Sequence, residues 1–467
     1  MPEQHRRFWI YRFWGNSTEN AKRKMQSAKP KPTSLKPGAH RAKGAGIPGF
    51  ELWFFILLGG YIMANSDSSV SRRGFMAAGG VAALSLTIPA SRGLYAAASK
   101  VKLGIIGCGG RGSWIADLFA QHGGYNITAV HDYFQDRADG CGGKHNVPEN
   151  RRFTGLSSYK KLLEHVDAVA IISPPYFHPD QAEDAVAAGK HVYIAKPIAV
   201  DAPGCLRIEA AGKKARAGKL AFLVDFQTRA DPFYIEAIKR VHEGAIGRYA
   251  FGESWYHAGD PFPGHYKHLQ DDPKNPENRL RAWGLDRHLS GDIITEQNIH
   301  TLDVASWIMD AEPLWACGTC ARKVRTVGTC ADTFSVFFQY PDHVAINFHS
   351  RQFEGYDSPD GINNRMFGNE GVLETSYGGQ VLIRGKHFYR GGKSPGIYKD
   401  GAVTNIAAFH KAIMEGDFRN PTVECSVRSN LVTILGRTAA YRNEKVTWKQ
   451  MLEAGEVLDA GLEGLKA

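Results

Sequence analysis

The sequence predicts two folded domains: an α/β domain built on a doubly wound parallel sheet, and an α+β domain with a large, mainly antiparallel sheet. Apolar runs of strand length alternate with helical patterns between residues 101 and 225, as in parallel sheets covered by helices. From residue 312 to 385 such runs follow one another without helices, which is typical of an antiparallel sheet with one covered face. We expect the first domain at residues 100–225 and the second, with closing C-terminal helices, at 226–467.

A glycine-rich turn follows the first expected strand, residues 101–106. It reads Gly107-Cys108-Gly109-Gly110-Arg111-Gly112 and leads into a helical pattern over residues 113–122. In a G-x-G-x-x-G turn the first glycine permits the tight turn, the second lets backbone approach a pyrophosphate, and the third lets helix pack on strand. The N–H groups at the start of the helix then face the phosphates. We therefore expect a Rossmann domain that binds a dinucleotide through Gly107, Gly109, Gly110, Arg111 and Gly112.

The second expected strand, residues 127–131, ends at Asp132, twenty residues beyond Gly112. A carboxylate at this place accepts hydrogen bonds from the adenosine ribose hydroxyls, and its charge repels a 2′-phosphate. The alternative is an ordinary turn residue at a strand end. The expected cofactor is therefore NAD, with NADP less favoured.

Two further strand ends are expected to reach the same ligand, because ligands bind beyond the carboxyl ends of parallel strands. The strand-like runs lie at residues 167–173 and 191–194. The loops that follow them read Ser173-Pro174-Pro175-Tyr176-Phe177-His178 and Ala195-Lys196-Pro197. Additional cofactor contacts are expected from Ser173, Pro174, His178, Lys196 and Pro197.

The order of these motifs resembles the glucose–fructose oxidoreductase / inositol dehydrogenase (Gfo/Idh/MocA) family over nearly all of residues 100–455. The resemblance rests on G-x-G-x-x-G, then SPPxxxH, then AGKHVYIAKP. It implies that Lys196 lies beside the nicotinamide, and that the open face of the second sheet forms a homo-oligomer, a dimer or tetramer. The family usually carries glutamate before this lysine, where Ala195 stands here. The protonation state of Lys196 is therefore an open question.

The second domain is expected to begin with a helix over residues 233–244 and a strand over 247–256. A polar stretch, roughly residues 257–290, then reads as a long loop, and loops of that length are usually functional or disordered. Trp283 in this stretch is suited to stacking on a sugar face, and Arg287 to binding hydroxyls or a carboxylate. The alternative is a surface loop with an incidental aromatic residue.

The most informative constellation follows at residues 290–307. If this segment is helical, Glu296, His300, Asp303 and Trp307 share one face. Titratable groups on one stripe each need a partner if they are purely structural, whereas they suit proton transfer. We expect Glu296 to orient His300, His300 to act as general acid/base, and Asp303 to bind substrate. A solvated helix face with a paired histidine is the alternative.

These residues predict an NAD-dependent oxidoreductase that moves hydride between a secondary alcohol of a sugar, glycoside or cyclitol and nicotinamide. His300 takes or returns the hydroxyl proton, and Lys196 polarises the oxygen. One alternative is a redox-neutral enzyme that retains NAD and cleaves a glycoside, or passes hydride from one sugar to another. A non-catalytic sugar-sensing protein on the same scaffold is a second alternative.

The charge distribution argues against a nucleic-acid partner. The formal net charge is +10, and the whole basic excess falls in residues 1–98. The remaining residues, 99–467, hold equal numbers of basic and acidic side chains, so the folded part offers no net attraction to a polyanion.

The basic N-terminal region contains Ser71-Arg72-Arg73-Gly74-Phe75-Met76, then an apolar stretch and Ala96-Ala97-Ala98. This order predicts a twin-arginine signal peptide over residues 63–98, hence the twin-arginine export machinery as a partner and a periplasmic location. An uncleaved signal that anchors the protein in the inner membrane is the alternative, and a chance Arg-Arg pair in an amphipathic helix is a further one. Residues 1–62 fit no class and are expected to be a non-native or disordered extension.

The seven cysteines do not predict a closed disulfide framework, because their number is odd. Cys317 and Cys320 form a C-x-x-C pair, but no second pair completes four zinc ligands. We expect cysteines within core strands and no metal site. A Cys320–Cys330 disulfide stays open.

Overall fold

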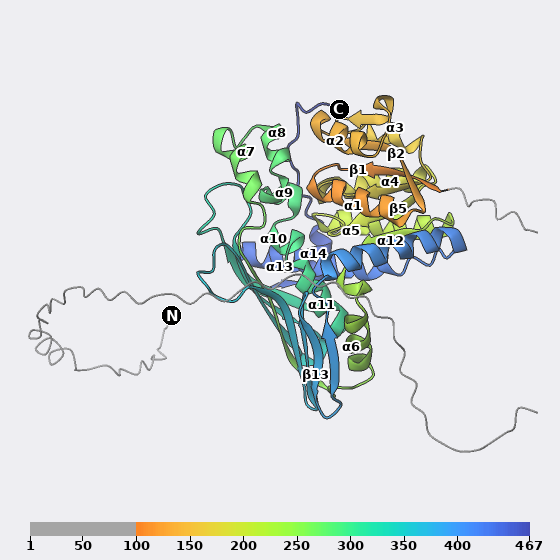
Figure 1. Ribbon diagram of the computed structural model, residues 1–467. Coiled ribbons are helices and arrows are strands. Elements are labelled where there is room, and N and C mark those ends of the chain that lie inside the picture. Colours follow the sequence, from red (N-terminus) through yellow and green to blue (C-terminus); the bar gives the residue numbers. More distant parts are fainter. Residues whose placement is uncertain (1–99) are drawn as a thin grey trace, which may run out of the picture. The chain divides into compact units, whose positions relative to one another are not determined.

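The computed structural model describes residues 100–467, so the expected signal at residues 63–98 and the extension at 1–62 lie outside the described residues (Figure 1). The first domain is built on six parallel strands in the order β3-β2-β1-β4-β5-β6. This confirms the doubly wound sheet, whose strand order reverses between β1 and β4 and opens a crevice for ligands there. The strands are β1 Val101–Ile106, β2 Tyr125–Asp132, β3 Arg152–Thr154, β4 Ala168–Ile171, β5 His191–Ala195 and β6 Phe222–Asp225.

Helices cover both faces of this sheet, and its central strands are therefore almost continuously apolar and buried. Helix α1 begins at Gly110, three residues before the expected start, because glycines carry no hydrophobic periodicity. The helices are α1 Gly110–His122, α2 Gln135–Lys144, α3 Tyr159–Leu163, α4 His178–Ala187 and α5 Ala202–Ala217.

The second domain contains a nine-stranded sheet in the order β14-β13-β12-β11-β7-β10-β9-β8-β15. Strands β7 and β10 pair in parallel, and the other neighbours pair antiparallel. This confirms the large, mainly antiparallel sheet. The strands are β7 Tyr249–Ala258, β8 Trp315–Ala321, β9 Thr333–Gln339, β10 Ala345–Gln352, β11 Gly361–Gly368, β12 Gly371–Ser376, β13 Gln380–Gly385, β14 Tyr389–Lys393 and β15 Val446–Thr447.

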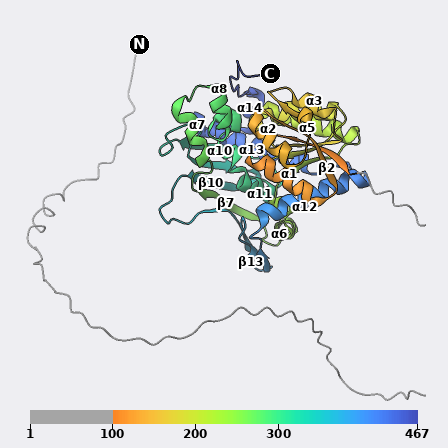
Figure 2. The same cartoon turned by 45° about the horizontal axis from the view of Figure 1, so that its top comes forward.

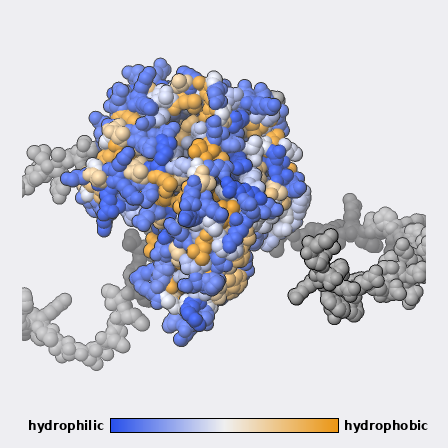
Figure 3. Space-filling view, turned by 180° about the vertical axis from the view of Figure 1, so that it is seen from behind, coloured by the Kyte–Doolittle hydropathy of each residue, from blue (hydrophilic) through white to orange (hydrophobic). Residues whose placement is uncertain are grey.

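One face of this sheet packs on helices α6 (Pro232–His242), α11 (Ile299–Met309) and α13 (Thr422–Arg442). Alternate residues of β9, such as Phe334 and Val336, are buried on that face, whereas Ser335 between them is exposed. From behind, the molecule presents hydrophilic residues with interspersed apolar patches (Figure 3). The expected oligomer through the open face stays a prediction.

Helix α12 (Ile397–Glu415) connects the two domains because it lies along α1 (Figures 1 and 2). Its residues Ala402, Ile406 and Phe409 are buried in the same apolar cluster as Leu103 and Ile105 of β1. Helix α14 (Trp448–Ala454) follows β15, and its N-terminus is capped by a capping box between Thr447 and Gln450.

The polar stretch at residues 257–290 is helical rather than a long loop, which corrects the expectation. It contains α7 (Tyr266–Asp271), α8 (Pro276–Arg281) and α9 (Arg287–Ser290). The Asn275 side chain accepts hydrogen bonds from the first N–H groups of α8, and Asp286 does the same for α9. Helices this short show too few apolar repeats to be found by periodicity.

The segment that carries Glu296 and His300 is not one continuous helix. Helix α10 (Ile293–Glu296) ends where Gln297 and Asn298 interrupt the chain, and α11 begins at Ile299. His300 and Asp303 therefore share a helix, whereas Glu296 belongs to the turn before it.

Cys317 and Cys320 lie in β8, as expected for strand cysteines. All seven cysteines are free, so the open question of a Cys320–Cys330 disulfide is answered against it. Over residues 100–467 no helix is both long and apolar enough to cross a bilayer. In the same range no group of three potential ligand residues gathers for a metal ion.

Candidate functional site

The glycine turn between β1 and α1 forms a cradle that only glycines allow. A Cβ atom on Gly112 would lie 1.8 Å from the carbonyl oxygen of Gly107, and Gly107 itself has φ of +93°. Gly109 is the N-cap of α1, and no side chain forms a capping hydrogen bond with the start of the helix. A Cβ on Gly110 would meet nothing within 4 Å. The turn thus offers open space and free N–H groups, which fits a pyrophosphate.

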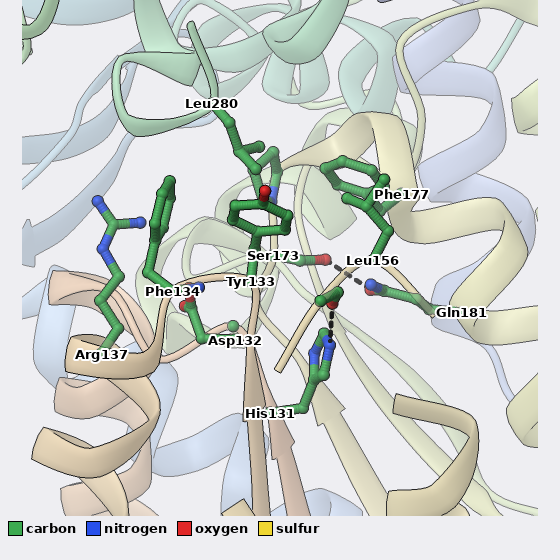
Figure 4. Close-up of a pocket in the computed structure, with 13 residues that line it drawn as sticks. His131, Asp132, Tyr133, Phe134, Arg137, Leu156, Ser173, Phe177, Gln181 and Leu280 are labelled. Atoms are coloured by element: carbon green, nitrogen blue, oxygen red, sulfur yellow. Dashed lines mark hydrogen bonds between the residues drawn. The ribbon is translucent and has the colours of Figure 1, made fainter. Parts of the chain in front are cut away.

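A cavity of about 40 Å³ lies beside this turn, and we call it the first cavity (Figure 4). Asp132 lies in its wall, with one carboxylate oxygen 2.8 Å from the N–H of Cys108 and the other 3.0 Å from that of Phe134. Each oxygen keeps a lone pair for a ribose hydroxyl. The lining also includes Gly107, Tyr133, Phe134, Arg137, Leu156, Ser173, Pro174, Phe177, Gln181 and Leu280.

Arg137 is a lining residue of the first cavity that the motifs did not identify. Its guanidinium lies 5.0 Å from the centre of the Phe134 ring, and 3.8 Å from the point a Cβ of Gly109 would occupy. Among residues 100–467 it forms no ion pair. Its position in the first turn of α2, soon after Asp132, is the signal that could have revealed it. A cation there suits the anionic part of a dinucleotide.

A second cavity of about 370 Å³, the interdomain cavity, lies between the two domains. Lys196 and Pro197 reach it from the end of β5, and Glu296 and His300 from α10 and α11. Ser173 lines both cavities, which therefore adjoin. The remaining lining is Arg111, Ile172, Pro175, Ala195, Tyr256, Pro261, Phe262, Trp283, Gln297, Ile362, Tyr377 and Tyr398.

Lys196 forms an ion pair with Glu296 across the domain boundary. Its Nζ donates to the Glu296 carbonyl oxygen at 2.5 Å and lies 3.3 Å from Glu296 Oε1. Burial lowers the pKa of Lys196, and the Glu296 charge opposes that shift. Ala195, the residue before Lys196, has no carboxylate. Glu296 from the second domain places one beside the lysine instead.

A hydrogen-bonded chain continues from Glu296 to β7. Gln297 Nε2 donates to Glu296 Oε2, and Tyr256 donates from its hydroxyl to Gln297 Oε1 at 2.8 Å. Tyr256 therefore fixes which way the Gln297 amide points, and the amide fixes the Glu296 carboxylate. The sequence did not identify Tyr256 or Gln297. The hydrogen bonds that join them connect β7 to the break between α10 and α11, and these segments are distant in the sequence.

His300 has no hydrogen bond to Glu296, which corrects the expected orienting role of that carboxylate. The break at Gln297 directs Glu296 to Lys196 instead. Burial, together with the positive charges of Lys196 and Arg111, lowers the pKa of His300 well below its usual value. Its Nδ1 atom is buried and finds no partner among residues 100–467, and its side chain lines the interdomain cavity.

Arg111 lines the interdomain cavity, and its charge is already compensated. Its Nη2 lies 2.6 Å from Oδ2 of the fully buried Asp225, and Nη1 donates to the Tyr398 hydroxyl at 2.8 Å. Trp114 and Tyr398 stack beside the guanidinium. The structure thus places Arg111 toward the substrate side of the turn.

His178 lines neither cavity, in contrast to the expected cofactor contact. Its two ring nitrogens lie 2.8 Å from the carbonyl oxygens of Ser173 and Pro197, so it links the two strand-end loops. Burial lowers the pKa of His178 to about 4.

Asp303 and Arg287 also lie outside the cavities, so the structure does not support their expected contact with substrate. Asp303 is fully buried, where it pairs with Arg229 at 2.8 Å and accepts a hydrogen bond from Ser429. Arg287 lies 3.9 Å from the ring centre of Tyr441. Trp283 alone of the three expected substrate contacts lines the interdomain cavity.

Comparison with known proteins places both domains. Residues 101–220 match the model of the oxidoreductase family with NAD-binding Rossmann fold (GFO_IDH_MocA), and residues 234–374 match the GFO/IDH/MocA C-terminal domain. Inositol 2-dehydrogenase 2 of Saccharopolyspora erythraea is 29% identical over 226 residues, 48% of this chain. The aligned region spans 58% of that relative, less than two thirds of its length.

Solved structures share the fold of the chain. The aldose-aldose oxidoreductase of Caulobacter crescentus, complexed with glycerol, has a TM-score of 0.59 at 21% identity and covers 74% of this chain and 99% of its own. A levoglucosan dehydrogenase in complex with NADH and levoglucosan has a TM-score of 0.60 at 17% identity, with 75% and 100% covered. The two family models together span more than half of the sequence. The chain therefore belongs to the Gfo/Idh/MocA family of oxidoreductases, with an NAD-binding Rossmann domain.

Proposed function

We propose that the protein is an NAD-dependent oxidoreductase acting on a secondary alcohol of a sugar, glycoside or cyclitol. The observation that carries this proposal is the interdomain cavity, where Lys196 and His300 from different domains meet beside the glycine turn. Inositol 2-dehydrogenases among the relatives, and a levoglucosan dehydrogenase among the similar structures, support the choice of a polyhydroxylated substrate.

NAD fits the residues beside the first cavity. The N–H groups at the start of α1 would hold its pyrophosphate, and Asp132 would accept the ribose hydroxyls. When bound, the nicotinamide supplies the carbon that accepts or returns a hydride. The Asp132 charge disfavours the 2′-phosphate of NADP, so we propose NAD as the cofactor.

His300 is suited to take the proton of the substrate hydroxyl. Because its pKa is lowered well below the usual value, the imidazole is neutral near pH 7 and Nε2 can accept a proton. Lys196, held by Glu296, can donate a hydrogen bond to the same substrate oxygen. In the oxidation direction the alcohol carbon loses a hydride and its hydroxyl proton passes to His300.

The charges around the interdomain cavity favour an uncharged substrate. Lys196 pairs with Glu296, and Arg111 pairs with Asp225, so an anionic sugar would compete with carboxylates already in place. Trp283 lies with Phe262 in the wall, their ring centres 5.7 Å apart. Flat aromatic surface of this kind suits the apolar face of a sugar ring.

Replacing His300 by Ala tests the proposed function. Loss of the general base should lower kcat by about 10²- to 10⁴-fold while bound NAD is retained. The measurement is NADH formation with a panel of neutral sugars, glycosides and cyclitols. His387→Ala is the control, because that side chain is 56% exposed on the surface.

An unchanged kcat in the His300→Ala protein would refute the assigned role. A wild-type protein that binds these sugars but never reduces NAD would instead support the sugar-sensing alternative.

A further inference from the structure

A segment at the end of the described chain, residues 458–467, crosses from α14 to the Rossmann domain, and we call it the tail segment. Figure 1 shows it as a dark blue trace that passes α8 and α9 and ends beside α2 and α3. It starts where the N–H of Leu458 donates to Asp201 Oδ2 at 3.0 Å. This path brings the C-terminal residues 458–467 to the outer side of the first cavity, which is formed by the Rossmann domain.

Hydrogen bonds hold the far end of the tail segment on the wall of the first cavity. The carbonyl oxygen of Lys466 accepts from the N–H of Leu156 at 2.9 Å, and the N–H of Lys466 donates to the Tyr133 hydroxyl at 3.2 Å. Lys466 Nζ donates to Thr154 Oγ1 at 2.9 Å. Leu156 and Tyr133 both line the first cavity, so the tail segment binds directly to its wall.

Apolar contacts hold the middle of the tail segment to the same wall. Ala460 is buried, and Leu462 and Leu465 pack in one cluster with residues that line the first cavity. The lining residues in that cluster are Tyr133, Phe134, Leu156, Phe177 and Leu280 (Figure 4).

The close approach of the tail segment requires a glycine at position 155. A Cβ atom there would lie 2.2 Å from the carbonyl oxygen of Ala467, and Gly155 has φ of +103°. Only glycine therefore lets the β3 loop and the tail segment touch.

Helix α8 completes the outer wall and is tied to the tail segment. Arg279 Nη1 donates to the Gly461 carbonyl oxygen at 3.2 Å. Arg281 lies 3.8 Å from the ring centre of Phe134, and the Tyr133 hydroxyl donates to Glu277 at 2.8 Å. A dinucleotide leaving by this side must separate Tyr133 and Phe134 from both α8 and the tail segment.

We propose that the tail segment is part of the dinucleotide site and slows the release of NAD. The proposal rests on the proposed function for the identity of the cofactor. The tail segment acts through the residues that touch the ligand, so its residues are positioning residues. Opening the wall would expose the buried apolar surface of Leu462 and Leu465, which slows release.

The test is the rate at which loaded protein releases NAD. Full-length protein is saturated with radiolabelled NAD, diluted into excess unlabelled NAD, and followed by filter binding. The variants are a chain ending at Val457 and the double variant Leu462→Asp/Leu465→Asp. Both should release NAD about tenfold faster or more, because part of the closed wall is lost.

Two controls separate this proposal from the proposed function. Glu463→Gln changes an exposed side chain of the tail segment and should leave the release rate unchanged. His300→Ala should lose turnover and still retain NAD.

Equal release rates in wild type and in the double variant would overturn the role of the tail segment. Release from wild type as fast as from the chain ending at Val457 would overturn it as well. A wild type that binds no NAD at all would refute the proposed function itself.

Discussion

At the scale of single residues, the site depends on how charged groups from two domains compensate one another. Lys196 is buried at the end of β5, and burial alone would favour its neutral form. Glu296 lies 3.3 Å away and favours the charged form. The protonation of Lys196 therefore depends on a carboxylate one hundred residues later in the chain.

Replacing Glu296 by Gln should shift the pH dependence of kcat/KM. Without the carboxylate the pKa of Lys196 falls further, so the ammonium form is lost at lower pH. The basic limb of the profile should move down by about one pH unit. The measurement is kcat/KM across the pH range, with Glu253→Gln, a partly exposed residue of β7, as the control.

Tyr256→Phe should move the same limb in the same direction by a smaller amount, because it frees the Gln297 amide to rotate. A basic limb that stays in place in the Glu296→Gln protein would show that Lys196 does not depend on this pair.

At the scale of elements, the approach of α1 to β1 governs whether the dinucleotide cradle exists. A Cβ on Gly112 would collide with the carbonyl carbon and oxygen of Gly107, which are backbone atoms and cannot rotate away. Gly110 lies on the same turn with nothing nearby. The two glycines thus form a matched pair for experiment.

Gly112→Ala should lower the free energy of unfolding by about 1–3 kcal/mol, since α1 must move away from the turn. Gly110→Ala should leave folding stability essentially unchanged. Urea unfolding followed by circular dichroism measures both, and NAD titration should show weaker binding for Gly112→Ala. Equal stability of the two variants would contradict the close approach.

At the scale of the whole molecule, the proposed cofactor and the proposed export are linked. We propose that residues 63–98 direct export by the twin-arginine pathway, which carries proteins already folded. A protein that leaves the cytoplasm in this way can carry its dinucleotide only if the site holds it. In the role that we propose for the tail segment, its contacts with Tyr133 and Leu156 slow the loss of NAD.

Replacing Arg72 and Arg73 together by Lys should keep the protein in the cytoplasm. Cell fractionation and immunoblotting of the native host measure this, and Arg92→Lys is the control outside the arginine pair. Periplasmic accumulation of the double variant would contradict the twin-arginine assignment.

The parts that the sequence predicts well are those specified by neighbouring residues. The glycine turn and Asp132 belong to one βαβ unit, where spacing along the chain sets spacing in space, and both lie at the first cavity as expected. The loops at Ser173 and Lys196 follow from the same rule for parallel strands. The second sheet could be predicted equally well, because β9 and β10 alternate between buried and more exposed residues.

The sequence by itself therefore determined the two sheets, the dinucleotide cradle and the approach of Lys196 and His300 to one cavity. Only the tertiary structure decided which side chains these residues pair with. Asp303 shares α11 with His300 as expected, yet Arg229 and Ser429 from other elements bury it. Glu296 meets Lys196 because the chain breaks at Gln297, and the tail segment meets Tyr133 and Leu156 across the whole fold. Local pattern shows which face a residue occupies, whereas packing between distant elements decides what that face meets.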